Sequence, residues 1–271
     1  MVQTGFGAFG WYEMMSRVKR SLVRLDRALS KLGVASRSEA KRLIAEGRVR
    51  VGGRVVRDAA LPVTPERGTV TVDGSTATTR QWRTIAFNKP RGVVTTCRDP
   101  DGRPTVFDIL GNDARSLVAI GRLDMASTGL LLLTTDTQLA NYLTDPANAI
   151  VRRYVVTVRG AVHDAEADRM VTGINALRAS SVVIRKRSGR ETHLIVELVE
   201  GQNREIRRML DALGHQVTKL MRVAFGGIEL GNLQPGEWRE VSREELGRLE
   251  VAKGTEFTTQ ARSKRRRTKK N

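Results

Sequence analysis

The run of four leucines from Leu130 to Leu133 is the feature that most limits what this chain can fold into. A membrane span needs roughly 20 apolar residues, so this short run is better explained as a strand buried on both faces of a sheet. The apolar segment Leu117 to Ile120 predicts a second strand, and the loop that joins the two strands carries Gly121, Arg122 and Asp124. We therefore expect Asp124 to lie at the end of a buried sheet instead of on a solvated surface.

The residues from Ile85 onward show more strand patterns than helix patterns. Short apolar runs rich in β-branched residues are typical of strands, and fewer amphipathic segments separate them. This mixture predicts an α+β fold with a mixed, mostly antiparallel sheet. Strands are expected at Thr84 to Phe87, Val93 to Thr96, Leu117 to Ile120, Leu130 to Thr134, Tyr154 to Val158, Val182 to Arg185 and His193 to Leu198. Helices are expected at Thr137 to Leu143, Asp164 to Thr172 and Arg204 to Leu213.

A smaller α/β unit is expected before this sheet. Apolar residues recur at helical spacing from Leu22 to Leu32, and Gly33 follows where such a helix would end. Ser36 and Glu39 have the spacing of a capping box, which predicts the start of a second helix. The Gly52–Gly53 pair between short valine-containing runs predicts a hairpin, because a two-residue turn needs positive φ angles.

The charge balance points to a polyanionic partner. The 47 lysines and arginines outnumber the 29 acidic residues, giving a net charge of +18, and nucleic acid is the first candidate. Cys97 is the single cysteine, so no intramolecular disulfide can form, and we expect a cytoplasmic location. The histidines are scattered and no phosphate-binding glycine loop follows a strand, so we expect neither a metal nor a nucleotide cofactor. No membrane association is expected, and no exposed apolar stripe contradicts a monomer.

The first unit resembles an S4-type RNA-binding domain over the stretch LDRALSKLGVASRSEAKRLIAEGRVRVGGRVV. This resemblance implies that its basic surface contacts phosphates and reads RNA shape more than base sequence. The residues expected to bind RNA here are Arg37, Lys41, Arg42 and Arg48. The alternative is that these charges only solvate a helix.

The segment Gly121 to Asp136, GRLDMASTGLLLLTTD, resembles the signature of the ribosomal RNA pseudouridine synthases that carry an N-terminal S4-type domain. The resemblance extends over about residues 22 to 247. Further blocks agree in order: FNKPRGVVTT, RRYVVTVRG and EGQNREIRRMLDALGHQVTKLMRVAFGGIELGNLQPGEW. The chain departs from the family at Thr135 to Thr137 and at Arg152, where a lysine is usual. We expect these departures to lie outside the reacting centre and to affect packing and RNA contact.

The resemblance implies that the second unit isomerises uridine in ribosomal RNA to pseudouridine, by flipping the base and without a cofactor. Asp124 aligns with the essential aspartate, Arg207 with the arginine that pairs with it, and Tyr154 with the tyrosine that stacks on the base. Three roles stay open for Asp124: attack on the sugar, addition to the base, or removal of a ribose proton. Without the resemblance, Asp124 could be a turn residue, Arg207 a solvated helix residue and Tyr154 an ordinary strand aromatic.

Other basic residues of the second unit are expected to grip the RNA backbone. A helix that begins near Asn203 would place Arg204 and Arg207 about one turn apart on one face. One of them could then reach the cleft and the other a phosphate. The residues expected to bind RNA in this unit are Lys89, Arg91, Arg122 and Arg204. Solvated surface charge is the alternative for each of them.

The chain is expected to divide into five segments. These are a flexible extension at 1–21, an S4-type domain at 22–75, a linker at 76–83, a catalytic domain at 84–250 and a disordered basic tail at 251–271. Whether residues 1–14 are translated stays open, since Met14 and Met15 offer later starts. The tail is expected to add salt-sensitive RNA affinity that does not depend on base sequence.

Two other functions compete with catalysis. A non-catalytic ribosome assembly factor could keep the same scaffold and bind ribosomal RNA or a pre-ribosomal particle. A DNA-binding regulator is disfavoured, because neither a helix-turn-helix nor a zinc pattern occurs. The sequence leaves open which uridine is modified and in which ribosomal subunit.

Overall fold

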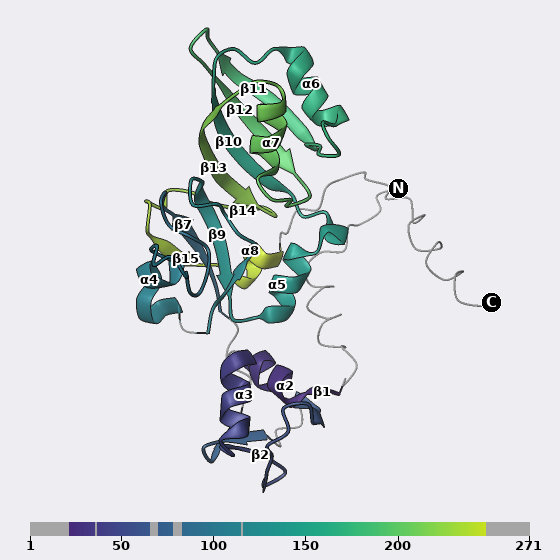
Figure 1. Cartoon of the computed structure of the whole chain (residues 1–271), viewed down its shortest axis with the longest axis vertical. Helices are drawn as coiled ribbons and strands as arrows, with labels where there is room; N and C mark the ends of the chain where they lie inside the picture. Colours follow the sequence, from purple (N-terminus) through teal and green to yellow (C-terminus); the bar gives the residue numbers. More distant parts are fainter. Residues whose placement is uncertain (1–21, 36, 66–69, 78–82, 115, 248–271) are drawn as a thin grey trace, which may run out of the picture.

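The structure is a computed structural model that describes residues 22–35, 37–65, 70–77, 83–114 and 116–247. The helices α2 (Leu25–Lys31) and α3 (Arg37–Ala45) lie at one end of its long axis, and α6 (Asp164–Thr172) lies at the other (Figure 1). Four expectations concern residues outside these ranges: the extension 1–21, the tail 251–271, most of the linker 76–83, and Ser36 of the capping box.

The N-terminal unit packs two helices against a small antiparallel sheet. Leu29 of α2, Ile44 of α3 and Val49 are fully buried in one core. Gly52 and Gly53 have φ angles of +56° and +80°, which confirms the predicted two-residue turn. The sheet has the order β3 (Arg54–Val55), β2 (Val49–Val51), β5 (Val70–Val72) and β6 (Ser75–Thr76), and β1 (Val23–Arg24) pairs with β4 (Pro62–Val63).

A second, larger sheet forms the body of the C-terminal unit. In the described ranges it has nine strands. Their order is β11 (Ser181–Arg187), β12 (Glu191–Leu198), β10 (Arg152–Arg159), β13 (Val217–Phe225), β9 (Thr128–Thr134), β7 (Thr84–Lys89) and β15 (Trp238–Glu240), with β14 (Ile228–Glu229) beside β13 and β8 (Val118–Ile120) beside β9. Only the β9–β13 pair is parallel among these described pairings, so the predicted mostly antiparallel sheet is confirmed.

The leucine run of β9 is buried on both faces, as predicted. All four side chains of Leu130–Leu133 have 0% exposure. The odd-numbered pair packs into the core that includes Met209 of α7 (Glu205–Ala212), and the even-numbered pair packs into the core that includes Leu143 of α5 (Thr137–Thr144). The remaining helices are α4 (Val106–Leu110), α8 (Arg243–Gly247) and two short 3-10 turns at Gly111–Ala114 and Pro146–Asn148. None of the helices in the described ranges has both the length and the apolar character needed to cross a membrane.

Two parts of the strand prediction need correction. Val93–Thr96 is not a strand: Val94 makes only an isolated bridge to Thr105, and Gly92 enters the segment with a φ of +85°. The long strand β13 was missed because its sequence, VTKLMRVAF, contains charged residues that suggest a solvated segment. One of these, Arg222, is only 2% exposed.

Candidate active site

The loop between β8 and β9 holds Asp124 at the end of these buried strands, as the sequence predicted. The Thr95 hydroxyl donates to the Leu123 carbonyl at 2.9 Å and accepts from the Leu123 amide at 3.3 Å. The Gly92 amide donates to the Met125 carbonyl at 2.8 Å. Both neighbours of Asp124 are therefore fixed by hydrogen bonds to the segment that precedes α4, which limits the positions that the carboxylate can take.

Lys89 supports the same loop from inside the protein. Its side chain has 0% exposure, and its ammonium donates to the carbonyl oxygens of Pro90 at 2.9 Å and Ser127 at 2.8 Å. Burial lowers the pKa of Lys89 to about 8, against the opposing attraction of Asp124. The expectation that Lys89 grips the RNA backbone is wrong, because its ammonium is buried and already bound. It positions the loop that carries the carboxylate.

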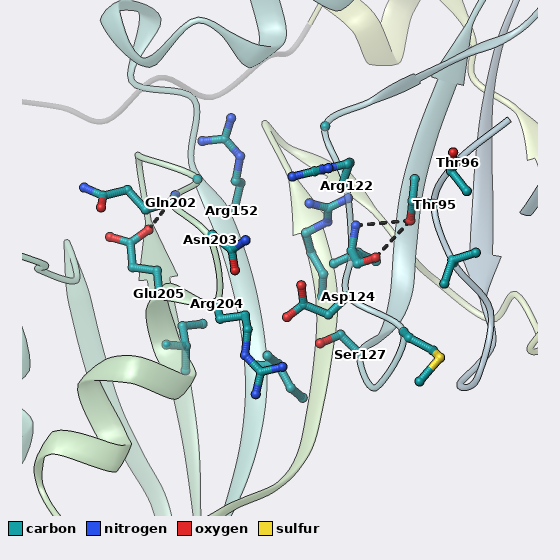
Figure 2. A pocket seen from close by; sticks show the side chains of 18 of the residues that line it. Thr95, Thr96, Arg122, Asp124, Ser127, Arg152, Gln202, Asn203, Arg204 and Glu205 are labelled. Carbon is teal, nitrogen blue, oxygen red and sulfur yellow. Dashed lines mark hydrogen bonds between the residues drawn. The ribbon is translucent and has the colours of Figure 1, made fainter. Parts of the chain in front are cut away.

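Asp124 lies in a cleft of about 870 Å³. Figure 2 shows the Asp124 loop with Arg122 and Ser127 on one side, and the segment Gln202–Glu205 on the other. A third part of the lining comes from residues between Val94 and Arg103. Among the residues that the structure describes, no group of three or more His, Cys, Asp or Glu side chains could hold a metal ion.

Tyr154 of β10 lines this cleft and is 8% exposed. The apolar side chains of Leu198, Ile206 and Leu220 line the same cleft. An aromatic ring among aliphatic side chains provides a surface on which a planar base can stack, since every base has an apolar face. The structure thus brings Tyr154 and Asp124 to one cleft, as predicted.

Arg207 of α7 lies behind the Asp124 loop and does not line the cleft. Its guanidinium donates to the Ala126 carbonyl at 3.4 Å. Burial lowers the pKa of Arg207, the like charges of Arg204 and Arg91 lower it further, and the attraction of Asp124 opposes them. Arg207 is therefore within electrostatic reach of the carboxylate. The expected direct pairing is absent, since Asp124 makes no ion pair with any residue in the described ranges.

The turn before α7 differs from the predicted helix start by one residue. Arg204 has a φ of +50°, a left-handed conformation that is uncommon for residues other than glycine, and α7 begins at Glu205. The Glu205 carboxylate is 3% exposed and accepts from the Gln202 amide at 3.2 Å, and burial raises its pKa. This buried acid anchors the turn. Arg204 is consequently exposed in the cleft wall, whereas Arg207 is half-buried.

Arg152 lies in the cleft wall, so the expectation that it would be outside the reacting centre is wrong. Its guanidinium donates to the carbonyl oxygens of Leu143, Ile150, Val199 and Glu200 at 2.8 to 3.4 Å. These bonds join the end of α5 to the loop after β12. Arg152 therefore contributes to packing, as expected, but it does so in the wall of the cleft.

Three buried side-chain atoms lack a hydrogen-bond partner within the described residues: Ser127 Oγ, Arg207 Nε and Arg222 Nη2. All three belong to residues around the segment that runs from Asp124 into β9. Ser127 is in that segment, Arg207 donates to Ala126, and Arg222 donates to Leu130 through Nε at 2.7 Å. Buried donors are rarely left unpaired in proteins, and in the described residues these three lie around the segment that carries Asp124.

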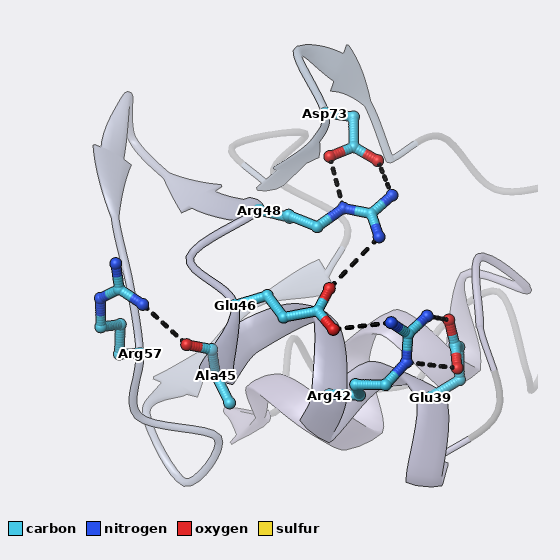
Figure 3. Close-up of polar contacts among 7 residues, drawn as sticks. All are labelled: Glu39, Arg42, Ala45, Glu46, Arg48, Arg57 and Asp73. Atoms are coloured by element: carbon cyan, nitrogen blue, oxygen red, sulfur yellow. Dashed lines mark hydrogen bonds and ion pairs between the residues drawn. The ribbon is translucent and has the colours of Figure 1, made fainter.

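Ion pairs occupy two of the residues predicted to bind RNA in the N-terminal unit. Arg42 bonds to Glu39 and, at 2.6 Å, to Glu46. Arg48 bonds to Asp73 at 2.5 and 2.8 Å and to Glu46 at 3.3 Å (Figure 3). These exposed contacts are weak individually, but they partly neutralise this surface.

The other residues predicted to bind RNA are accessible, with the exception of Lys89. They are exposed and make no ion pair within the part of the chain that the structure describes: Arg37, Lys41, Arg91, Arg122 and Arg204. Arg122 and Arg204 line the cleft from opposite sides, while Arg37 and Lys41 belong to α3. Their contact with RNA remains a prediction.

Known proteins resemble this chain over most of its length. The model of the RNA pseudouridylate synthase family matches residues 83–212, and that of the S4 domain matches residues 23–67. An uncharacterized RNA pseudouridine synthase of Aquifex aeolicus is 38% identical over 245 residues, which cover 89% of this chain and 98% of the relative. The ribosomal large subunit pseudouridine synthase B of Bacillus subtilis is 34% identical over 232 residues, covering 83% and 95% of the two chains. A crystal structure of a pseudouridylate synthase is similar with a TM-score of 0.58 and 26% identity, covering 84% of this chain and 100% of that one.

Proposed function

The chain belongs to the RNA pseudouridylate synthase family and is an RNA uridine isomerase, and on this premise we propose that it modifies a specific uridine of ribosomal RNA. Relatives from Bacillus subtilis and Pseudomonas aeruginosa are named ribosomal large subunit pseudouridine synthase B. Their names favour the large subunit as the source of the substrate. The S4 domain that precedes the catalytic unit supports RNA as the partner.

The reaction rearranges bonds within one nucleotide. The bond between N1 and the ribose C1′ breaks, a bond between C5 and C1′ forms, C5 loses a proton and N1 gains one. No atoms or electrons are gained or lost overall, so acid–base and nucleophilic groups of the protein are sufficient.

Asp124 is the group that we assign to this chemistry. The observation that carries the assignment is its position in the cleft opposite an accessible turn, with Tyr154 in the same lining. The charges of Lys89 and Arg207 interact with that of Asp124, so both basic groups lie near the carboxylate that each of the three possible routes uses. The carboxylate acts on the sugar or on the base of the bound nucleotide.

Base flipping would deliver that nucleotide. A uridine inside a helix or stacked loop cannot reach a carboxylate within a cleft, and extruding it costs a few kcal/mol. Stacking on Tyr154 and contact with Leu220 would offset part of this cost. Arg122 and Arg204 would hold the phosphates at the two walls.

The test uses transcripts of both ribosomal RNAs, incubated with the full-length protein and mapped for pseudouridine at single-nucleotide resolution. We expect one or a few positions in the large-subunit transcript to be modified. The same positions should be unmodified in RNA from cells that lack the gene. If tight binding occurs without any pseudouridine in either transcript or pre-ribosomal particles, the alternative of a non-catalytic assembly factor holds instead.

A further inference from the structure

Two arginine side chains are buried in the lining of the cleft. Arg152 of β10 is 6% exposed and Arg222 of β13 is 2% exposed. Their guanidinium carbons lie 4.8 and 5.1 Å from the centre of the same aromatic ring, that of Phe225. The charge of Arg222 acts on Arg152, and aromatic faces attract cations without cancelling their charge.

Among the described residues, the Glu205 carboxylate attracts Arg152 electrostatically but forms no ion pair with it. Neither arginine forms an ion pair with the described residues, and the one hydrogen-bond acceptor of Arg222 among them is the Leu130 carbonyl, 2.7 Å from Nε. Burial lowers the pKa of Arg152 and the like charge of Arg222 lowers it further, against opposing contributions from Tyr154 and Glu205. Nη2 of Arg222 is buried and has no hydrogen-bond partner in the part of the chain that the structure describes. Two buried like charges and an unpaired donor are both unfavourable, so an anion from outside the chain would stabilise the arrangement.

We propose that Arg152 and Arg222 form a subsite for one phosphate group of the RNA chain, beside the nucleotide that reacts at Asp124. The proposal rests on the proposed RNA substrate. A guanidinium presents donors in a planar fork that matches two phosphate oxygens. Arg222 supplies the free donor, while Arg152, whose donors already bind four carbonyl oxygens, mainly supplies charge.

This subsite differs from the exposed arginines of the cleft in what it contributes. Arg122 and Arg204 are exposed and can follow a phosphate over a range of positions. Arg222 is held by the Leu130 carbonyl and enclosed by the sheet, so it accepts a phosphate at one position. A phosphate fixed there sets the register of the strand relative to Asp124, because backbone contacts position a nucleic acid without reading its bases.

The first test measures binding of inorganic phosphate to the full-length protein by thermal unfolding, with chloride added to keep the ionic strength constant. We expect a saturable rise in the melting temperature of the wild type. Arg222→Met should lose most of that rise and Arg222→Lys should keep part of it, since lysine retains the charge but not the fork. Arg153→Gln is the matched control. Arg153 follows Arg152 in β10, but it is not part of the cleft lining and pairs with Glu197 at 2.8 Å. The melting temperature of Arg153→Gln should rise with phosphate as that of the wild type does. An equal rise in the wild type and all variants would overturn the proposal.

The second test uses a short RNA that contains the mapped uridine, with one methylphosphonate placed in turn at each linkage around it. In the wild type, a single neutralised linkage should weaken binding about tenfold. The Arg222→Met variant should lose little more at that linkage, because the two changes remove the same contact. Additive losses, or a wild-type scan without a sensitive linkage, would overturn the subsite.

The two experiments separate this proposal from the proposed function. Phosphate binding does not require turnover, so a response that depends on Arg222 upholds the subsite even in a protein that forms no pseudouridine. Conversely, the Arg222 variants could bind inorganic phosphate and the methylphosphonate RNAs as the wild type does, while the wild type forms pseudouridine. That result would uphold the proposed function and overturn the subsite.

Discussion

Gly129 of β9 and Arg222 of β13 approach so closely that no side chain fits between their backbones. They are Cα partners in the parallel pairing, and a β-carbon on Gly129 would lie 2.3 Å from the Arg222 carbonyl oxygen and 2.9 Å from its amide nitrogen. This short pairing joins the strands from β11 to β13 with the strands from β9 to β15. Asp124 comes from one group and Tyr154 from the other, so the joint sets their relative position.

Gly129→Ala should therefore destabilise the protein strongly. Gly129 has a φ of +97° and would place its new methyl group against backbone, so we expect a loss of about 3 kcal/mol or more in the free energy of unfolding. Urea denaturation would measure it. Gly231→Ala is the control, because Gly231 has a φ of +60° but nothing within 4 Å of its added carbon. That change should cost only about 1 to 2 kcal/mol, and equal losses would contradict the role of close approach.

Thr95→Val should loosen the Asp124 loop while leaving the core intact. Valine has nearly the same shape but cannot form the two hydrogen bonds to Leu123. We expect about 1 to 2 kcal/mol less stability and roughly tenfold slower pseudouridine formation under single-turnover conditions. Thr95→Ser keeps the hydroxyl and should retain most of the activity. A fully active valine variant would mean that these bonds do not position Asp124.

Lys89 should make stability depend on pH in the alkaline range. Its pKa of about 8 in the folded protein lies below the ordinary 10.5, so the folded chain releases this proton before the unfolded chain does. The cost of burying the charge is therefore fully present below pH 8 and disappears as the pH rises from 8 to 10.5. Lys89→Met cannot titrate, so the stability of the wild type relative to this variant should rise by on the order of 2 kcal/mol between pH 8 and 9.5. Thermal unfolding at each pH would measure this difference. If the stabilities of the two proteins change equally between pH 8 and 9.5, the lowered pKa of Lys89 is contradicted.

Local sequence patterns were sufficient where backbone geometry decides the structure. The Gly52–Gly53 turn follows from the need for positive φ, and the strand Leu130–Leu133 follows from a leucine run too short to span a membrane. The loop position of Asp124 follows from the two strands around it. These features depend on neighbours in sequence, so they are visible without a structure.

The parts that could not be predicted depend on contacts between distant segments. Lys89 and Arg222 have charged side chains that local patterns place in solvent, but carbonyl oxygens of Ser127 and Leu130 accept from them inside the protein. The residues around Thr95 have the pattern of a strand, but the segment forms no strand, and the Thr95 hydroxyl donates a hydrogen bond to the Leu123 carbonyl. No residue spacing in the sequence predicts these hydrogen-bond partners. Arg152 gave a signal only as a departure from the family pattern.

The most direct test of the central claim compares Asp124→Asn with the wild type in single-turnover pseudouridine formation on the ribosomal RNA transcript that the wild type modifies. We predict that the variant binds this RNA with wild-type affinity and unfolds at a similar temperature, but forms product at least about a thousandfold more slowly. Asp124→Ala should behave in the same way. Modification at the wild-type rate by either variant would contradict the assignment of this carboxylate to the reaction.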